Sequence, residues 1–260
     1  MLHIGAILER PPGPKYTATL RFAELAPRAP LPRPSTLAKV RAAAPPDFVF
    51  ALRAPRSSMV SSRGALRFDD QLEGALQWLV NATEALQAKA VVFNTPAELT
   101  PGARSRELFA EYVRRLPVVE NRHYVWLPQG LWEPSDAQTL CGELGLCYGF
   151  DPLEARAVRA SNAVYATLRA LGHRASFSPA ALSDALATTL QHQPQTVFMC
   201  VDAERGFDVA RRLQALATDA DPLADDDDAA VADGDVADVA DVADDGADYE
   251  SDYEDSSDAP

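Results

Sequence analysis

The sequence contains few of the features that mark exported, membrane-spanning or disulfide-bonded proteins. It has three cysteines among 260 residues, Cys141, Cys147 and Cys200, and none of them forms a CxxC pair. No apolar stretch approaches the roughly 18 residues that a membrane span requires, and runs such as Thr196 to Val201 end after six residues. The N-terminal residues lack the basic segment and apolar core of a signal peptide. We therefore expect a cytoplasmic protein with free cysteines and no membrane partner.

Lysine is also scarce, since the chain has three Lys against 21 Arg. Guanidinium groups bind phosphate well, but these arginines are scattered, without the basic tract or motif that marks a nucleic-acid-binding protein. The four histidines form no HxH or HExxH pair, so the sequence predicts no metal site. The pattern argues against nucleic acid as a partner, and it leaves any cofactor unknown.

The negative charge of the chain is carried by its C-terminal end. The formal net charge is -14, yet residues 218–260 hold 18 acidic residues and no Lys or Arg. Residues 1–217 then hold 20 acidic and 24 basic residues, a net charge of +4. Repulsion between like charges and a shortage of large apolar side chains predict a disordered tail. We expect a domain over 1–217 and an acidic tail over 218–260 that solubilises the protein, masks its basic body or docks a basic protein partner.

Residues 1–217 alternate short apolar segments with segments of helical periodicity. The clearest helix begins after Asp69 and carries apolar residues at helical spacing from Leu72 to Val80. Further helices are expected at 103–116, 135–144, 179–191 and 204–217, and strands at 2–7, 21–25, 48–53, 90–94, 117–121, 146–149, 163–168 and 196–201. This alternation predicts the α/β class and a single compact (β/α)8 barrel. A doubly wound open α/β sheet is the alternative, although no glycine-rich phosphate loop follows the first strand.

Polar residues at the ends of the apolar runs are candidates for a ligand site, because barrel chemistry lies at the C-terminal ends of the strands. We assign Arg53, Asn94 and Asp202 to ligand binding and Glu24 to catalysis as a carboxylate. The alternative is that these residues are polar because a strand meets solvent at its end.

Residues 118–126 are the most informative segment. Glu120 and His123 are candidates for acid–base catalysis, and Arg122 could bind an anion. Trp126 offers a flat ring on which a base or sugar could stack. The alternative is a Glu120–Arg122 ion pair that holds the strand end, with His123 as its hydrogen-bond partner.

The same segment, Val118 to Trp126, resembles the VE-x-RH-x-x-W stretch of domain-of-unknown-function family 72, the YecE-like family. Phe48 to Pro55 (FVFALRAP) and Ala90 to Pro96 (AVVFNTP) are similar to two further strands of that family. The resemblance covers residues 2–217 and implies a TIM-like barrel, with no known activity. Gly5 to Glu9 and Glu24 to Arg28 stand where the family carries G-T-S-G-W and E-x-N-x-T-F-Y loops, so we expect a divergent member.

Two functions follow from these observations. In the first, the barrel binds or processes a small anionic ligand, of phosphorylated, sugar-like or nucleotide-like character, at its C-terminal face. In the second, the barrel is catalytically degenerate and acts as a binding or scaffold module whose acidic tail docks a basic partner. The sequence leaves open whether the protein is an enzyme.

Overall fold

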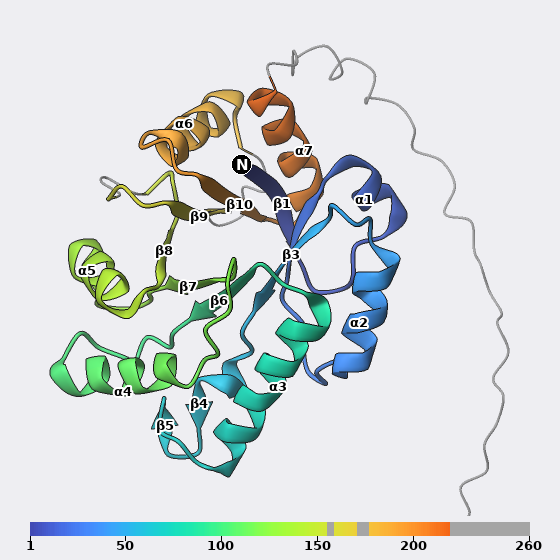
Figure 1. The fold of residues 1–260 in the computed structure, drawn as a ribbon. Helices are drawn as coiled ribbons and strands as arrows, with labels where there is room; N and C mark the ends of the chain where they lie inside the picture. Colours follow the sequence, from blue (N-terminus) through green and yellow to red (C-terminus); the bar gives the residue numbers. More distant parts are fainter. Residues whose placement is uncertain (155–158, 171–176, 219–260) are drawn as a thin grey trace, which may run out of the picture. The chain divides into compact units, whose positions relative to one another are not determined.

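Eight parallel strands form a closed barrel in this computed structural model, which describes residues 1–154, 159–170 and 177–218 (Figure 1). Their order around the barrel is β1-β10-β9-β8-β7-β6-β3-β2. The barrel strands are β1 (Leu2–Leu8), β2 (Phe22–Leu25), β3 (Val49–Arg53), β6 (Ala90–Asn94), β7 (His123–Leu127), β8 (Cys147–Phe150), β9 (Ala163–Arg169) and β10 (Thr196–Asp202). Because β1 pairs with both β2 and β10, the sheet has no open edge. The predicted barrel is confirmed, and the open doubly wound sheet is wrong.

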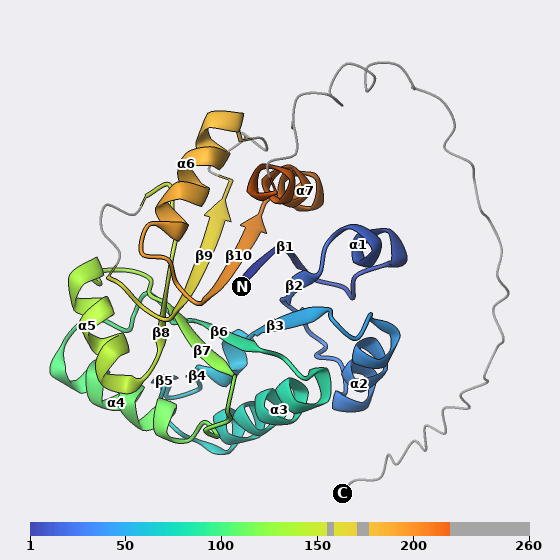
Figure 2. The ribbon, with the colours of Figure 1, turned by 45° about the horizontal axis from the view of Figure 1, so that its top comes forward.

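Helices surround the barrel (Figures 1 and 2). They are α1 (Pro14–Thr19), α2 (Pro34–Ala43), α3 (Asp70–Leu86), α4 (Ala103–Arg114), α5 (Pro134–Leu144), α6 (Pro179–Leu190) and α7 (Gly206–Ala217). The helices α4 to α7 lie within about two residues of the predicted positions, and α3 begins where predicted but continues six residues beyond Val80. The helices α1 and α2 were not predicted. Residues 219–260, almost all of the predicted tail, lie outside the described residues, so the domain boundary stays a prediction.

The strands are buried on both faces, which explains why they read as continuous apolar runs. Side chains alternate along each strand between the barrel interior and the surrounding helices. One cluster of buried side chains fills the interior: Phe22, Ala51, Ala90, Val92, Val125, Leu127, Cys147, Ala163, Tyr165, Phe198 and Cys200. Residues between them, such as Phe50, Phe93 and Trp126, belong to a larger cluster packed under the helices. The interior is therefore a packed core, and open space is expected at the ends of the strands.

The predicted strand at 117–121 is misplaced. This segment is a loop in which Asn121 has a left-handed backbone conformation (φ 59°) and the Arg122 N–H donates to the Val119 carbonyl at 3.3 Å. The strand β7 starts at His123 instead. Glu120 and Arg122 therefore precede the strand and lie at the N-terminal end of the barrel, not at its C-terminal end.

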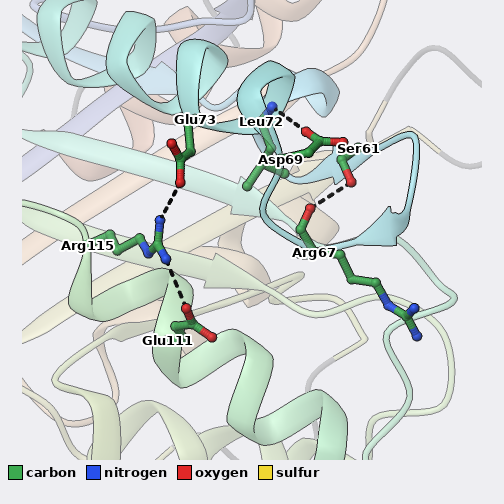
Figure 3. Close-up of polar contacts among 7 residues, drawn as sticks. All are labelled: Ser61, Arg67, Asp69, Leu72, Glu73, Glu111 and Arg115. Atoms are coloured by element: carbon green, nitrogen blue, oxygen red, sulfur yellow. Dashed lines mark hydrogen bonds and ion pairs between the residues drawn. The ribbon is translucent and has the colours of Figure 1, made fainter.

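The connection from β3 to α3 contains the 3-10 turn η1 (Arg56–Ser58) and a small hairpin of β4 (Val60–Ser61) and β5 (Gly64–Ala65). The Ser61 hydroxyl donates to the Arg67 carbonyl at 2.7 Å (Figure 3). Asp69 then caps α3 as predicted, since its Oδ1 accepts from the Leu72 N–H at 2.9 Å. These contacts in the connection that follows the C-terminal end of β3 determine where α3 begins.

Arg115 joins α3 to α4 (Figure 3). Its guanidinium lies 3.0 Å from Glu73 on α3 and 3.0 Å from Glu111 on α4. It also lies over the Phe68 ring, 3.5 Å from the ring centroid. Both carboxylates are exposed, so each ion pair contributes about 0–1 kcal/mol to stability.

Candidate functional site

A buried polar network lies inside the barrel between β2, β3, β9 and β10. The Glu24 side chain has no exposed surface, and its Oε1 accepts a hydrogen bond from Arg53 Nε. Its Oε2 accepts from the Tyr165 hydroxyl at 2.6 Å. The Tyr165 oxygen lies 3.3 Å from Cys200 Sγ, and because the hydroxyl proton goes to Glu24, the thiol is the donor there. Both oxygens of Glu24 are thus occupied.

The pKa values of Tyr165, Cys200 and Arg53 in this network are all raised. Burial raises the pKa of Tyr165 well above its ordinary value, and Cys200 and Glu24 raise it further. Burial, with Glu24, also raises the pKa of the Cys200 thiol. For Arg53, burial works to lower the pKa, but the Glu24 carboxylate outweighs it and the pKa is raised. Tyr165 and Cys200 therefore stay neutral, and a neutral buried thiol is a poor nucleophile.

Charges of alternating sign continue from this network around the C-terminal mouth of the barrel. Asp202 at the end of β10 lies within electrostatic range of Arg53 and contributes to its raised pKa. Its neighbour in register is Arg169, at the end of β9. The Arg169 backbone N–H donates to Asp151 Oδ2 at 3.2 Å, and burial raises the pKa of the Asp151 carboxyl. The mouth can therefore pair with both anionic and hydrogen-bonding groups of a ligand.

Two buried polar atoms near this mouth have no hydrogen-bond partner among the residues that the structure describes. They are Asn94 Oδ1, at the end of β6, and Thr167 Oγ1, on β9. By the alternation of β6 and β9, both side chains point into the barrel. An unpaired buried polar atom costs about 1–3 kcal/mol, so a water or a ligand hydroxyl that reached these atoms would stabilise the fold.

A cavity of about 730 Å³ opens beside the mouth, between the ends of β7, β8 and β9 and the start of α5. Arg159 and Arg169 line it together with three carboxylates, those of Glu133, Asp151 and Glu154. The half-buried Tyr148 ring lies in its wall. A cavity of this size suits a small organic ligand, which commonly occupies about 300–1,000 Å³.

Arg53, Asn94 and Asp202 end their strands as the sequence predicted. Asp202 lies within electrostatic range of Arg53, and Glu24 contacts Arg53 directly. The ligand-binding and catalytic roles of these residues stay predictions. The contacts of Glu24 favour a role in holding Arg53 over direct contact with a ligand.

Glu120, Arg122 and His123 do not join this group, because they lie at the opposite end of the barrel. The expectation that they leave the C-terminal end of a strand is wrong for the reason given above: β7 begins at His123. Trp126 is fully buried on the outer side of β7, between Phe109 and Trp132. The stacking surface predicted at Trp126 is therefore not available.

His123 packs inside the N-terminal end of the barrel together with His3. The His3 ring stacks on Phe198 with centroids 5.2 Å apart, and the His123 ring meets the edge of Phe198 at 5.6 Å. Burial lowers the pKa of both histidines, and the charge of the N-terminus lowers that of His3 further. The folded protein therefore favours neutral rings at this end of the barrel.

We expect stability to fall as the pH drops below about 6.5, where the histidines of the unfolded chain begin to take up protons. His3 and His123 bind these protons less readily in the folded protein. Stability therefore continues to fall until the pH is below their lowered pKa values. Urea unfolding measured between pH 7.5 and about pH 5.5 checks this. The double variant His3→Gln/His123→Gln should have a flatter profile over that range, and an unchanged slope in the variant would contradict the assignment.

Among the described residues, no three His, Cys, Asp or Glu side chains lie together in a way that could hold a metal ion. The three cysteines are free and buried. No described helix is both long enough and apolar enough to cross a membrane.

Sequence reasoning missed Tyr165 and Thr167. Their spacing of two, continued by Arg169 at the strand end, places all three on the interior side of β9, and that periodicity could have identified them. Arg159 lines the cavity because of where α5 packs, and no sequence signal pointed to that.

Comparisons with known proteins agree with this architecture. Residues 30–230 match the family model "Protein of unknown function DUF72". Two crystal structures of a DUF72 family protein (EF0366) from Enterococcus faecalis V583 are similar. The first has 11% identity and a TM-score of 0.54, and the match covers 79% of this chain and 92% of that chain. The second has 12% identity and a TM-score of 0.59, and the match covers 85% of this chain and 95% of that chain. The crystal structure of SacUVDE has 8% identity and a TM-score of 0.54, and the match covers 78% of this chain and 82% of that chain. Identities this low show a shared fold alone, and no curated protein matches.

Proposed function

The chain belongs to the DUF72 family, and from this premise we propose that its barrel binds a small anionic ligand in the cavity at the C-terminal face. The observation that carries the proposal is the cavity of about 730 Å³ that Arg159 and Arg169 line. A phosphate or carboxylate group suits these guanidinium groups, because planar guanidinium donates two parallel hydrogen bonds to an oxyanion.

The remaining lining favours a ligand that also carries hydroxyl groups or a ring. Asp151 can accept a hydrogen bond from a ligand hydroxyl, and the Tyr148 ring provides an apolar wall. Asn94 and Thr167 offer two further unpaired polar atoms at the neighbouring mouth of the barrel. Sugar phosphates and nucleotides combine these features, so they are the ligand classes that we propose.

A thermal-shift screen of the full chain against sugar phosphates, nucleotides and the matching unphosphorylated compounds tests this proposal. A ligand present at 100 times its Kd should stabilise the protein by about 2.7 kcal/mol. Arg169→Gln should weaken binding of the phosphorylated compounds about tenfold or more, since a hydrogen bond to a charged group contributes about 1.5–3 kcal/mol. Arg211→Gln, an exposed substitution on α7 that lines neither cavity, serves as the control.

Two results would count against the proposal. One is the absence of a shift with every phosphorylated compound. The other is equal affinity of the wild type and Arg169→Gln for each ligand that binds.

A second candidate function is favoured by the separation of charge along the chain. Residues 218–260 carry 18 acidic groups and residues 1–217 a net charge of +4, so we propose as the alternative that the tail docks a basic protein partner. Such binding should weaken as salt rises, because charges on exposed groups are screened over about 8 Å at physiological ionic strength. Unchanged interactors and unchanged salt response after deletion of residues 218–260 would exclude it.

A further inference from the structure

A second cavity, of about 420 Å³, lies at the N-terminal face of the barrel. Its lining includes Val49 at the start of β3, Lys89 just before β6 and Arg122 just before β7. These positions are at the opposite end of the strands from Arg169 and Asp202. The cavity is therefore separate from the proposed ligand site.

One nitrogen of the Arg122 guanidinium has no hydrogen-bond acceptor among the described residues. Its Nε donates to the Ala88 carbonyl at 3.3 Å. Its Nη1 is buried, and over residues 1–154, 159–170 and 177–218 it finds no hydrogen-bond acceptor. The nearby Tyr124 hydroxyl donates its proton to the Pro117 carbonyl at 2.6 Å. Burial raises the Tyr124 pKa, and a hydrogen bond with the Arg122 side chain, together with its positive charge, opposes that increase. This contact does not involve Nη1, which stays without a partner.

Arg122 borders the cavity, and its unpaired, buried guanidinium nitrogen requires an acceptor, because a buried charge without a partner is costly. Lys89 is exposed at the same cavity and forms no ion pair within the part of the chain that is described. We propose that this cavity is a second ligand site, which takes the oxyanion of a small carboxylate or phosphate compound on Arg122 and Lys89. This site is independent of the ligand proposed for the C-terminal face.

Three carboxylates in the lining set the strength of this site. Asp47, Glu84 and Glu120 all border the cavity and repel an anion that enters it, although Asp47 is paired with Arg21 at 3.1 Å. The site therefore favours a small anion that reaches Arg122 without approaching these carboxylates, and we expect weak binding. Because Glu120 repels the anion, neutralising it should tighten binding, whereas removing the charge of Arg122 should weaken binding.

The test is an NMR titration of the full chain with inorganic phosphate and, separately, acetate, at constant ionic strength. We expect the amide signals of residues 120–124 to shift with both anions. Arg122→Gln should weaken binding about tenfold or more, Arg122→Lys should retain part of it, and Glu120→Gln should tighten it. Arg211→Gln and Arg169→Gln should leave binding at these amides unchanged.

Several outcomes would overturn the inference. If the amides of residues 120–124 do not shift with either anion, a water satisfies Nη1 and the cavity is not an anion site. Equal anion affinity of the wild type and Glu120→Gln would also show that the cavity is not an anion site. The Glu120→Gln variant leaves the Arg122 contacts in place. Loss of these shifts in Arg169→Gln would mean that the anion binds at the C-terminal face instead.

Discussion

Glu24→Ala is expected to lower the free energy of unfolding by about 3–5 kcal/mol, the usual effect of removing one partner of a buried ion pair. The substitution leaves the Arg53 guanidinium, whose side chain is 19% exposed, without its carboxylate. It also leaves the Tyr165 hydroxyl without the acceptor that it contacts at 2.6 Å. Denaturant unfolding monitored by tryptophan fluorescence measures the loss.

Two further variants show whether the stability loss in Glu24→Ala exceeds the loss caused by removing a single polar contact. Tyr165→Phe removes one hydrogen bond to the buried Glu24 carboxylate and keeps the ion pair, so it should cost about 1.5–3 kcal/mol, less than Glu24→Ala. Glu73→Gln removes an exposed pair with Arg115 and should cost about 1 kcal/mol or less. If Glu24→Ala were no more destabilising than Glu73→Gln, Glu24 would not be the centre of a buried network.

Trp126→Ala is expected to destabilise the protein by about 3–5 kcal/mol, because it empties a fully buried site. The indole packs against Phe109 with centroids 4.7 Å apart and against Trp132 at 4.9 Å. Its Nε1 donates to the Thr95 hydroxyl at 2.9 Å, so the substitution also leaves a buried hydroxyl without its partner. Denaturant unfolding, followed by circular dichroism, checks the effect.

Trp126→Phe keeps much of the buried ring and should be clearly less destabilising than the Ala variant. Ligand affinity at the C-terminal face should be the same in wild type and Trp126→Phe, because the side chain lies on the outer side of β7. A variant that keeps its stability and loses ligand binding would restore the stacking role predicted from the sequence.

Most of the barrel could be predicted from the sequence because its strands are buried on both faces. Runs such as Ala90 to Phe93 and Val197 to Val201 are continuously apolar and are bounded by helical periodicity. Asp69 at the N-cap and the apolar repeat after it located α3. The helix α1 was missed because it has six residues and buries one of them, Tyr16, too few for a periodic pattern.

The candidate site was harder to predict because one strand was misplaced. Pro117 to Val119 has the β-branched composition of a strand, but Asn121 turns the chain before β7 begins. The true strand starts at His123, so the residues in front of it lie at the N-terminal face. A shift of a few residues in one strand thus moved Glu120 and Arg122 from one end of the barrel to the other.

Contacts between distant parts of the chain could not be read from local patterns. Glu24 and Tyr165 are 141 residues apart, and their hydrogen bond follows from closure of the barrel. Arg169 and Asp202 were each visible as strand ends, but their pairing depends on the register between β9 and β10.

The central claim is that the ligand site lies at the C-terminal face, against Arg159 and Arg169. The most direct measurement is a crystal structure of the full chain with the phosphorylated compound that stabilises it most in the thermal-shift screen. We expect the phosphate group to contact Arg169, and the rest of the ligand to fill the cavity beside Tyr148 and Asp151. A ligand bound elsewhere on the barrel, with this cavity empty, would contradict the account.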